Sequence, residues 1–387
     1  MNDIHADDDA PILPGANIGV IGGGQLGRYF VIEARRMGYV TWVLDPDANA
    51  PAMQLAQNPL VAHYDDMEAL EKLGKVCDAV TVEFENVPSQ SLHMLSSHCR
   101  VAPSADCINV AQDRDLEKKT AQTHGLSPVP YASITSESDL DSAAKAIAFP
   151  AILKTARLGY DGKGQHVCNS VDDLTTAFQA VDGAACVLEQ RIDLAAEVSV
   201  VLARGVDGQS VVFPLSRNVH VGGILSTSTV PSGLSQEILA SAESQALKLA
   251  NGMNFVGVLA VEFFIDADGN VLFNEMAPRP HNSGHYTLDA TVTSQFEQQV
   301  RALCGLPLGS VELLSPVCMI NLLGDVWTDK GPDWMGVVET PRAHLHLYGK
   351  SAARAGRKMG HINCLADSAE DALATAGGIH AKLRQLS

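Results

Sequence analysis

A predicted β-hairpin in the second half of the chain constrains the fold most strongly. The apolar stretch 256–265 leads through a polar loop into a second stretch, 271–275. Asp268-Gly269 within the loop favours a two-residue type I′ turn, whose central positions both need φ > 0. The antiparallel register that follows from this turn sets Glu262 directly opposite Glu275. A register shifted by one residue would separate them.

Two glutamates in such a register indicate a bound cation. Directly opposed side chains have Cβ atoms about 4.5–5.5 Å apart, and like charges at that distance destabilise the pair. The strands are otherwise apolar, and hard oxygen ligands suit Mg²⁺. The sequence therefore predicts a magnesium site at Glu262 and Glu275.

A strand, a glycine turn and a helix follow one another from Asn17. The pattern Gly22-x-Gly24-x-x-Gly27, with Asp45 about twenty residues on, matches a dinucleotide fingerprint and by itself supports an NAD-dependent oxidoreductase. Any phosphate could use the backbone N–H groups of such a turn, and a tight turn without a ligand fits equally well. Further strands at 40–44 and 79–84 alternate with helices and predict a parallel α/β layer.

A second glycine loop lies at 159–165, Gly-Tyr-Asp-Gly-Lys-Gly-Gln, just after a strand that ends in Lys154. A lysine in this place can pair with nucleotide phosphates while the loop closes over them. The Walker pattern is absent from the chain. An ordinary hairpin loop is the alternative, but three glycines interleaved with polar residues disfavour it.

Two further stretches could contact ligands. The apolar strand 187–192 can offer its backbone to an adenine edge. Glu197 can accept hydrogen bonds from ribose hydroxyls, although it could equally be a solvated strand residue. Prolines around Arg279 could present it to a carboxylate or phosphate. His281 and His285 are expected to make ordinary hydrogen bonds, since a third zinc ligand is missing.

The last 80 residues contain the most basic stretch of the chain, 344–361. Such a stretch is usually a solvated surface loop. Its glycines and the strand before it favour an anion-binding loop.

The overall composition limits the partners. The 387 residues carry a formal net charge of −18, which argues against nucleic-acid binding by phosphate neutralisation. The eight cysteines form no C-x-x-C pair, so reduced, mostly buried thiols are expected. The sequence contains no apolar run of membrane-spanning length, and its acidic start is unlike a signal peptide. We expect a cytosolic protein without membrane partners.

These elements, in this order, resemble the ATP-grasp superfamily and, within it, the family of 5-(carboxyamino)imidazole ribonucleotide synthetases. The resemblance runs from about Asn17 to the C-terminus. Two departures, Tyr29 for methionine and Leu158 for a frequent glycine, touch no expected ligand. The most specific stretches are GGGQLGR (22–28), TVEFENV (81–87), GYDGKGQ (159–165), NEMAPRPHNSGH (274–285) and YGK…GRKMGH (348–361).

The resemblance implies a mixed α/β and α+β fold. It is an ATP-grasp fold with an N-terminal Rossmann-like (pre-ATP-grasp) domain and a small C-terminal β-rich domain. The expected parts are an acidic disordered tail at 1–16, the Rossmann-like domain at 17–112, the ATP-grasp domain at 113–308 and a substrate-closing domain at 309–387. The tail has no assigned role, and the family suggests a homodimer.

The resemblance also implies site residues. The ATP-binding positions correspond to Arg114, Lys154, Gly159, Tyr160, Asp161, Gly162, Lys163, Gly164, Gln165, Glu189, Gln190, Arg191, Ile192, Glu197, His220, Asn274 and Glu275. The metal carboxylates correspond to Glu262 and Glu275, in agreement with the hairpin. The ribonucleotide is expected beside Gln25, Glu85, Tyr160, Asp161, Arg279, Asn282, Ser283, Lys350 and Arg357. Catalytic roles are expected for Lys154, Tyr160, Asp161 and Arg279.

The implied reaction is the ATP-dependent carboxylation of aminoimidazole ribonucleotide with bicarbonate in purine synthesis. Phosphoryl transfer to bicarbonate would give carboxyphosphate, and the exocyclic amine would capture the carboxyl group, directly or through released CO₂. Mg²⁺ and Lys154 are expected to neutralise charge. The loop 159–165 is expected to close as a lid against water.

Three rival functions are open at this point. A formate-dependent glycinamide ribonucleotide transformylase belongs to the same superfamily and would differ in its carboxylate substrate. An NAD-dependent oxidoreductase built on Gly22 to Asp45 leaves the hairpin and the second glycine loop unexplained. A non-catalytic nucleotide-binding module is disfavoured, because the lysine, both metal carboxylates and the substrate arginines are all present.

Overall fold

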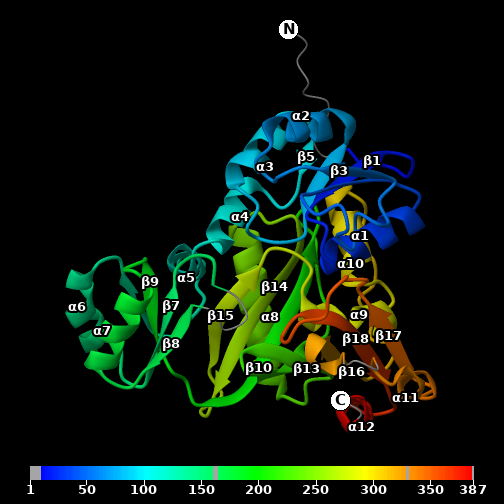
Figure 1. The fold of residues 1–387 in the computed structure, drawn as a ribbon. Coiled ribbons are helices and arrows are strands. Elements are labelled where there is room, and N and C mark those ends of the chain that lie inside the picture. The colour runs from blue at the N-terminus through cyan, green and yellow to red at the C-terminus, as the bar shows by residue number, and fades with distance from the viewer. Residues whose placement is uncertain (1–9, 160–163, 328–330, 386–387) are drawn as a thin grey trace.

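Three β-sheets organise the part of the chain that the structure describes (Figure 1). The structure, a computed structural model, describes residues 10–159, 164–327 and 331–385. All eight cysteines are free thiols and all but Cys99 are buried, as expected. Within the described ranges, no helix is long and apolar enough to span a membrane.

The first sheet is parallel and has the strand order β3-β2-β1-β4-β5. Its strands are β1 (Asn17–Ile21), β2 (Val40–Asp45), β3 (Asn58–Val61), β4 (Ala79–Val82) and β5 (Arg100–Val101). One apolar cluster joins it to α1 (Gln25–Arg36) and to the distant α10 (Gln295–Leu303), while another joins it to α2 (Met67–Val76), α3 (Ser89–Ser96) and α4 (Ala105–Ala111). Both faces are therefore covered, as in other parallel sheets, and the predicted α/β layer is confirmed.

The second sheet has four strands in the order β6-β9-β7-β8 and lies to one side of the molecule in Figure 1. Its strands are β6 (Tyr131–Ile134), β7 (Ala151–Thr155), β8 (Gln165–Cys168) and β9 (Cys186–Gln190). Helices α6 (Leu140–Ala146) and α7 (Val171–Ala180) share its apolar cluster. Helix α5 (Arg114–Thr123) precedes this unit and contacts both β9 and β15 (Val271–Ala277).

The third sheet has nine strands and runs from the hairpin to the C-terminal segment. Its order is β15-β14-β10-β12-β13-β16-β18-β17, with β11 on β10. The remaining strands are β10 (Leu194–Arg204), β11 (Ser210–Val212), β12 (Ser216–Val221), β13 (Ile224–Val230), β14 (Gly257–Asp266), β16 (Val317–Leu323), β17 (Ala343–Leu347) and β18 (Lys358–Leu365). The remaining helices are α8 (Gln236–Gly252), α9 (Thr287–Ala290), α11 (Trp334–Val338) and α12 (Ala369–Gln385), with short 3₁₀ turns at Glu137–Asp139, Asn282–Gly284 and Gly324–Val326. Strand β16 pairs with β13, so the last segment extends the central sheet.

The β14–β15 hairpin differs from the predicted one at its turn. Asp266 N donates to Asn270 O at 3.2 Å, which leaves three residues in the loop, and only Gly269 has a positive φ (83°). The two-residue type I′ turn is therefore wrong, and near the loop the register is shifted by one residue, with Phe263 opposite Phe273. The register shifts again beyond Phe263, where Asn274 is the extra residue of a β-bulge, and Glu262 is opposite Glu275. The predicted pairing is present, but the bulge produces it.

Candidate active site

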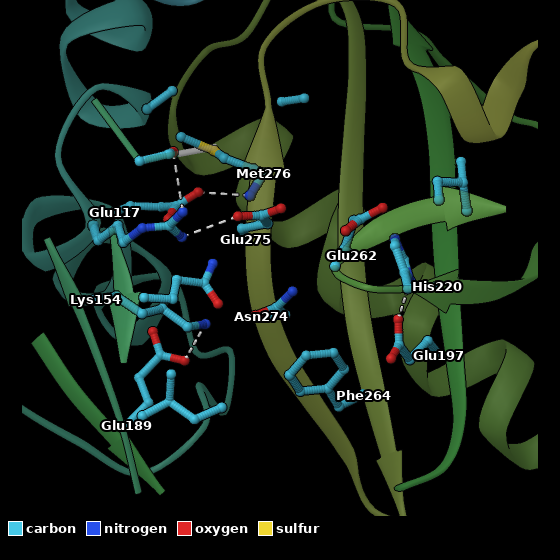
Figure 2. Close-up of a pocket in the computed structure, with 18 of the residues that line it drawn as sticks. Glu117, Lys154, Glu189, Glu197, His220, Glu262, Phe264, Asn274, Glu275 and Met276 are labelled. Atoms are coloured by element: carbon cyan, nitrogen blue, oxygen red, sulfur yellow. Dashed lines mark hydrogen bonds and ion pairs between the residues drawn. The ribbon is translucent and has the colours of Figure 1, made fainter. Parts of the chain in front are cut away.

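A cavity of about 690 Å³ lies between the four-stranded sheet and the β14–β15 edge of the large sheet. Figure 2 shows Lys154 and Glu189 on one side of it, with β15 carrying Asn274 and Glu275 beside them. Glu262 lies beyond β15, on β14. The wall thus joins strands from two sheets around one concentration of charge.

Glu262 and Glu275 lie opposite each other in this wall. Burial, together with the Glu275 carboxylate, raises the pKa of Glu262 to about 7. Burial also opposes ionisation of Glu275, but Arg114 and Lys154 outweigh it and lower the pKa of Glu275. Arg114 Nη1 donates to Glu275 Oε2 at 3.0 Å, and Ser199 Oγ donates to Glu262 Oε1 at 3.2 Å. Glu275 is therefore held ionised, whereas a bound cation would favour the ionised form of Glu262.

The donor set at this position fits Mg²⁺. Besides the two carboxylates, Asn274 Oδ1 is buried and has no hydrogen-bond partner in the structure. Among the described residues, no group of three or more His, Cys, Asp and Glu side chains is placed to hold a metal. One or two carboxylates completed by substrate phosphates are the usual protein contribution to a Mg²⁺ site.

Two lysines share one carboxylate beside the cavity. Glu189 Oε2 lies 2.6 Å from Lys154 Nζ, and Glu189 Oε1 lies 3.0 Å from Lys118 Nζ. Burial acts against ionisation, but the two ammonium groups lower the pKa of Glu189 to about 2. Lys154 is thus held at the cavity wall by Glu189, where a phosphate can compete with Glu189 for it.

A third pair lies on the far side of β14. His220 Nδ1 from β12 and the Glu197 carboxylate from β10 form an ion pair, and both residues line the cavity (Figure 2). Burial lowers the pKa of His220, but Glu197 and Glu262 overcome it and raise the pKa above its usual value. Glu197 is therefore ion-paired at the cavity wall, which argues against the alternative of a freely solvated strand residue.

The first domain reaches the cavity through Glu85. Arg279, just beyond β15, donates from Nε to Glu85 Oε2 at 2.7 Å. Gln112 Nε2 donates at 2.7 Å to the carbonyl oxygens of both Glu85 and Val87. The acidic side chain and its backbone are thus fixed independently.

Comparisons with known proteins agree along most of the chain. Residues 16–112 match the ribonucleotide synthetase preATP-grasp domain, 119–296 the ATP-grasp domain, and 317–375 the phosphoribosylaminoimidazole carboxylase C-terminal domain. The N5-carboxyaminoimidazole ribonucleotide synthase of Bacillus subtilis (strain 168) is 43% identical over 353 residues, which are 91% of this chain and 92% of the relative. This chain belongs to the N5-carboxyaminoimidazole ribonucleotide synthase family.

Two solved structures of this synthase family extend the comparison to ligands. The Staphylococcus aureus protein complexed with ADP is 39% identical, with a TM-score of 0.90 over 96% of this chain and 98% of that one. The Aspergillus clavatus protein, in complex with ADP and 5-aminoimidazole ribonucleotide, is 28% identical, with a TM-score of 0.88 over 97% and 100%. The chain is an ATP-grasp ligase of purine biosynthesis.

Most of the residues that the family resemblance indicated line the cavity. They are Glu85, Arg114, Lys154, Gly159, Gln165, Glu189, Gln190, Arg191, Ile192, Glu197, His220, Glu262, Asn274, Glu275, Arg279 and Asn282. Tyr160, Asp161, Gly162 and Lys163 lie outside the described residues.

Five indicated residues do not line the cavity: Gln25, Gly164, Ser283, Lys350 and Arg357. Lys350 Nζ donates to Lys358 O at 2.8 Å and Arg357 Nη1 donates to Ala352 O at 2.7 Å, so both hydrogen-bond within their own segment. The contacts with the nucleotide and the ribonucleotide that the family resemblance implies for these residues remain predictions.

Sequence reasoning missed four charged residues at this site, one of which, Asp193, lines the cavity beside Ile192. Glu117 and Lys358 line the cavity, and Lys118 pairs with Glu189 behind its wall. A sequence signal was available for Glu117 and Lys118, because positions 114, 117 and 118 share one face of a helix. Lys358 adjoins Arg357 in the basic stretch, and β18 begins there.

The glycine turn of the first domain is filled by the chain itself. Glu83 accepts hydrogen bonds from Gly24 N and, at 2.8 Å, from Gly27 N. Asp45 Oδ2 accepts from Gly23 N at 2.6 Å. A side chain at Gly24 would overlap the Glu83 carboxylate. The N–H groups of the turn, which the pattern offers to a phosphate, are occupied by a carboxyl group of the chain itself, which argues against the oxidoreductase alternative.

Proposed function

We propose that this chain carboxylates 5-aminoimidazole ribonucleotide with bicarbonate and ATP, giving N5-carboxyaminoimidazole ribonucleotide, ADP and phosphate. The observation that carries the proposal is one cavity that joins a buried lysine to two register-matched carboxylates. The names of the relatives and the ADP and aminoimidazole ribonucleotide complex support the choice of substrates.

The nucleotide would lie between the two sheets. Glu189 to Ile192 would border the adenine, and Glu197 would accept the ribose hydroxyls, since all line the cavity near one another in sequence. Lys154 would exchange its bond with Glu189 for one with a phosphate. Arg114, already held at the cavity by Glu275, would supply a second cation.

Glu262 and Glu275, with Asn274 Oδ1, would hold Mg²⁺. The ion supplies Lewis-acid stabilisation of the phosphate charge when it is bound. In this chain, Lys154 and Arg114 would neutralise the remaining phosphate charge. The buried cavity walls exclude water, which strengthens the electrostatic interaction between these cations and the phosphates.

The reaction balances in two steps. A bicarbonate oxygen attacks the γ-phosphorus of ATP, the bond to the ADP oxygen breaks, and carboxyphosphate and ADP result. The exocyclic amine nitrogen then attacks the carboxyl carbon, directly or after CO₂ is released in the site, and phosphate leaves with the bond pair while the amine loses a proton. Orientation and charge neutralisation are the protein's contributions.

Arg279, Glu85 and Asn282 would surround the ribonucleotide, with Tyr160 and Asp161 of the glycine loop as further expected contacts. Lys358 extends the positive charge of this end of the cavity. A homodimer in the cytoplasm is also proposed from the family resemblance, and light scattering should give twice the chain mass of 41.0 kDa.

ADP release tests the proposed function. MgATP with bicarbonate should be turned over rapidly only when aminoimidazole ribonucleotide is added, with a carboxylated product trapped. Lys154→Met should abolish this stimulation. Stimulation by formate with glycinamide ribonucleotide instead would replace the proposal with the transformylase, and no turnover with either pair would refute it.

A further inference from the structure

One face of helix α5 contacts three consecutive residues of β15. Arg114, Glu117 and Lys118 occupy positions i, i+3 and i+4, which lie together on a helix. Arg114 binds the Glu275 side chain. The other two bind the backbone on either side of it: Glu117 Oε1 accepts from Met276 N at 2.6 Å, and Lys118 Nζ donates to Asn274 O at 3.3 Å.

The contacted backbone belongs to the open edge of the large sheet. Strand β15 is the last strand of its sheet, so its outward N–H and C=O groups have no neighbouring strand. At Phe273 the edge is satisfied by the chain, because Phe273 N donates to Ser127 O at 2.7 Å and Val129 N donates to Phe273 O at 3.0 Å. Beyond Phe273 the partners are the side chains of α5.

These partners lie at the bulge. Asn274 is the extra residue that brings Glu275 opposite Glu262. A one-residue change of register turns a strand's side chains to the opposite face, so loss of the bulge would take Glu275 away from the cavity. Bulges near active sites commonly re-aim a side chain in this way.

Both side chains are ionisable and yet almost fully buried. Lys118 is 0% exposed and Glu117 is 3% exposed. Buried ion pairs often add little stability compared with apolar residues of similar size. Lys118 also pairs with Glu189, which in turn holds Lys154, so the same contact joins the phosphate lysine to the strand of Glu275.

We propose that Glu117 and Lys118 are positioning residues that hold the Asn274 bulge and thereby keep Glu275 opposite Glu262. Removing either side chain would raise the Mg²⁺ requirement of the enzyme, and this consequence rests on the proposed function. Removal would also weaken the hydrogen bond of the Met276 amide in the ligand-free protein, and this consequence does not rest on the proposed function.

Four variants on the same helix test the inference. Glu117→Ala removes the acceptor, Glu117→Gln keeps an acceptor oxygen at the same place, and Lys118→Met keeps the apolar stem. Lys119→Ala is the matched control, since Lys119 is an exposed neighbour that pairs only with Asp115 among the described contacts.

Hydrogen exchange of the Met276 amide is measured first, without nucleotide or metal. Glu117→Ala should accelerate it about tenfold or more, while Glu117→Gln and Lys119→Ala should stay close to wild type. In ADP-release assays, Glu117→Ala and Lys118→Met should raise the free Mg²⁺ for half-maximal rate about tenfold, and Glu117→Gln should restore it.

Unchanged exchange and unchanged Mg²⁺ dependence in Glu117→Ala would overturn the inference. So would an equal Mg²⁺ defect in Glu117→Gln, since the acceptor would then be irrelevant. If Glu117→Ala unfolds, Lys118→Met and Glu117→Gln decide by the same criteria. A wild-type protein without ATP turnover would refute the proposed function and leave the exchange result as the test of the bulge.

Discussion

Glu262 is repelled by Glu275 at the centre of the site. Removing the charge of Glu262 should therefore lower activity without lowering stability. We expect Glu262→Gln to lower ATP turnover about 100-fold or more, because a carboxylate for the cation is lost. The metal-free variant should unfold at the same or a higher temperature, because repulsion with Glu275 is relieved. Paired rate and calorimetric measurements check this, and a clear loss of metal-free stability would contradict it.

The pKa of Glu262 also predicts a pH dependence. It is raised from 4.5 to about 7 in the metal-free fold. A group whose pKa is higher when folded contributes its full stability below the unfolded pKa, and that contribution is lost as pH rises through the folded pKa. The metal-free melting temperature should therefore fall between about pH 5 and pH 8, while the stabilisation by MgATP should grow. Glu262→Gln should flatten both trends. Identical profiles for variant and wild type would refute this assignment.

At the scale of elements, the glycine turn before α1 depends on Glu83. Glu83→Ala should leave the N–H groups of Gly24 and Gly27 without their carboxyl acceptor and loosen the segment that leads to Glu85. We expect the KM for the ribonucleotide to rise about tenfold with little change for ATP, and added acetate or inorganic phosphate to restore part of the loss. The control is Asp65→Ala, an exposed carboxylate of the same domain. No rescue by either anion would contradict the role given to Glu83.

The elements also show where sequence reasoning succeeds and where it stops. Apolar runs and glycine turns located β1, β2 and β4 of the first sheet and the hairpin, because local patterning determines them, whereas the short strands β3 and β5 were not predicted. The hairpin turn was predicted wrongly, since Asp-Gly also fits a longer loop in which only glycine has a positive φ. The bulge at Asn274 depends on the side chains of α5, more than 150 residues earlier in the chain. Local patterns do not contain that information.

For the whole molecule, Glu85 and Arg279 connect the first domain to the end of β15. Glu85→Gln and Arg279→Lys should each raise the KM for the ribonucleotide more than that for ATP. A double-mutant cycle should give a coupling of about 0.5–3 kcal/mol, because the two residues are in direct contact. Steady-state kinetics with each substrate varied provide the measurement. Equal effects on both substrates would contradict the proposed division of the cavity.

The assembly of the site was predictable only in part. The order of motifs along the chain identified the family, most of the residues that it indicated line the cavity, and the comparisons agree with that family. The position of the basic stretch was not predictable in detail: Lys358 lines the cavity, while Lys350 and Arg357 bond within their own segment. That choice depends on how β18 joins the central sheet, which is a long-range pairing with β16.

The transfer of oxygen from bicarbonate to phosphate tests the central claim most directly. With ¹⁸O-labelled bicarbonate, MgATP and aminoimidazole ribonucleotide, the released phosphate should contain one bicarbonate oxygen. Carboxyphosphate breaks between its carbon and the bridging oxygen, so the bridging oxygen stays on the phosphate. Mass spectrometry of the phosphate reads this out, with Lys154→Met as the inactive control. Phosphate released at the same rate as ADP but without the label would contradict carboxyphosphate as the intermediate.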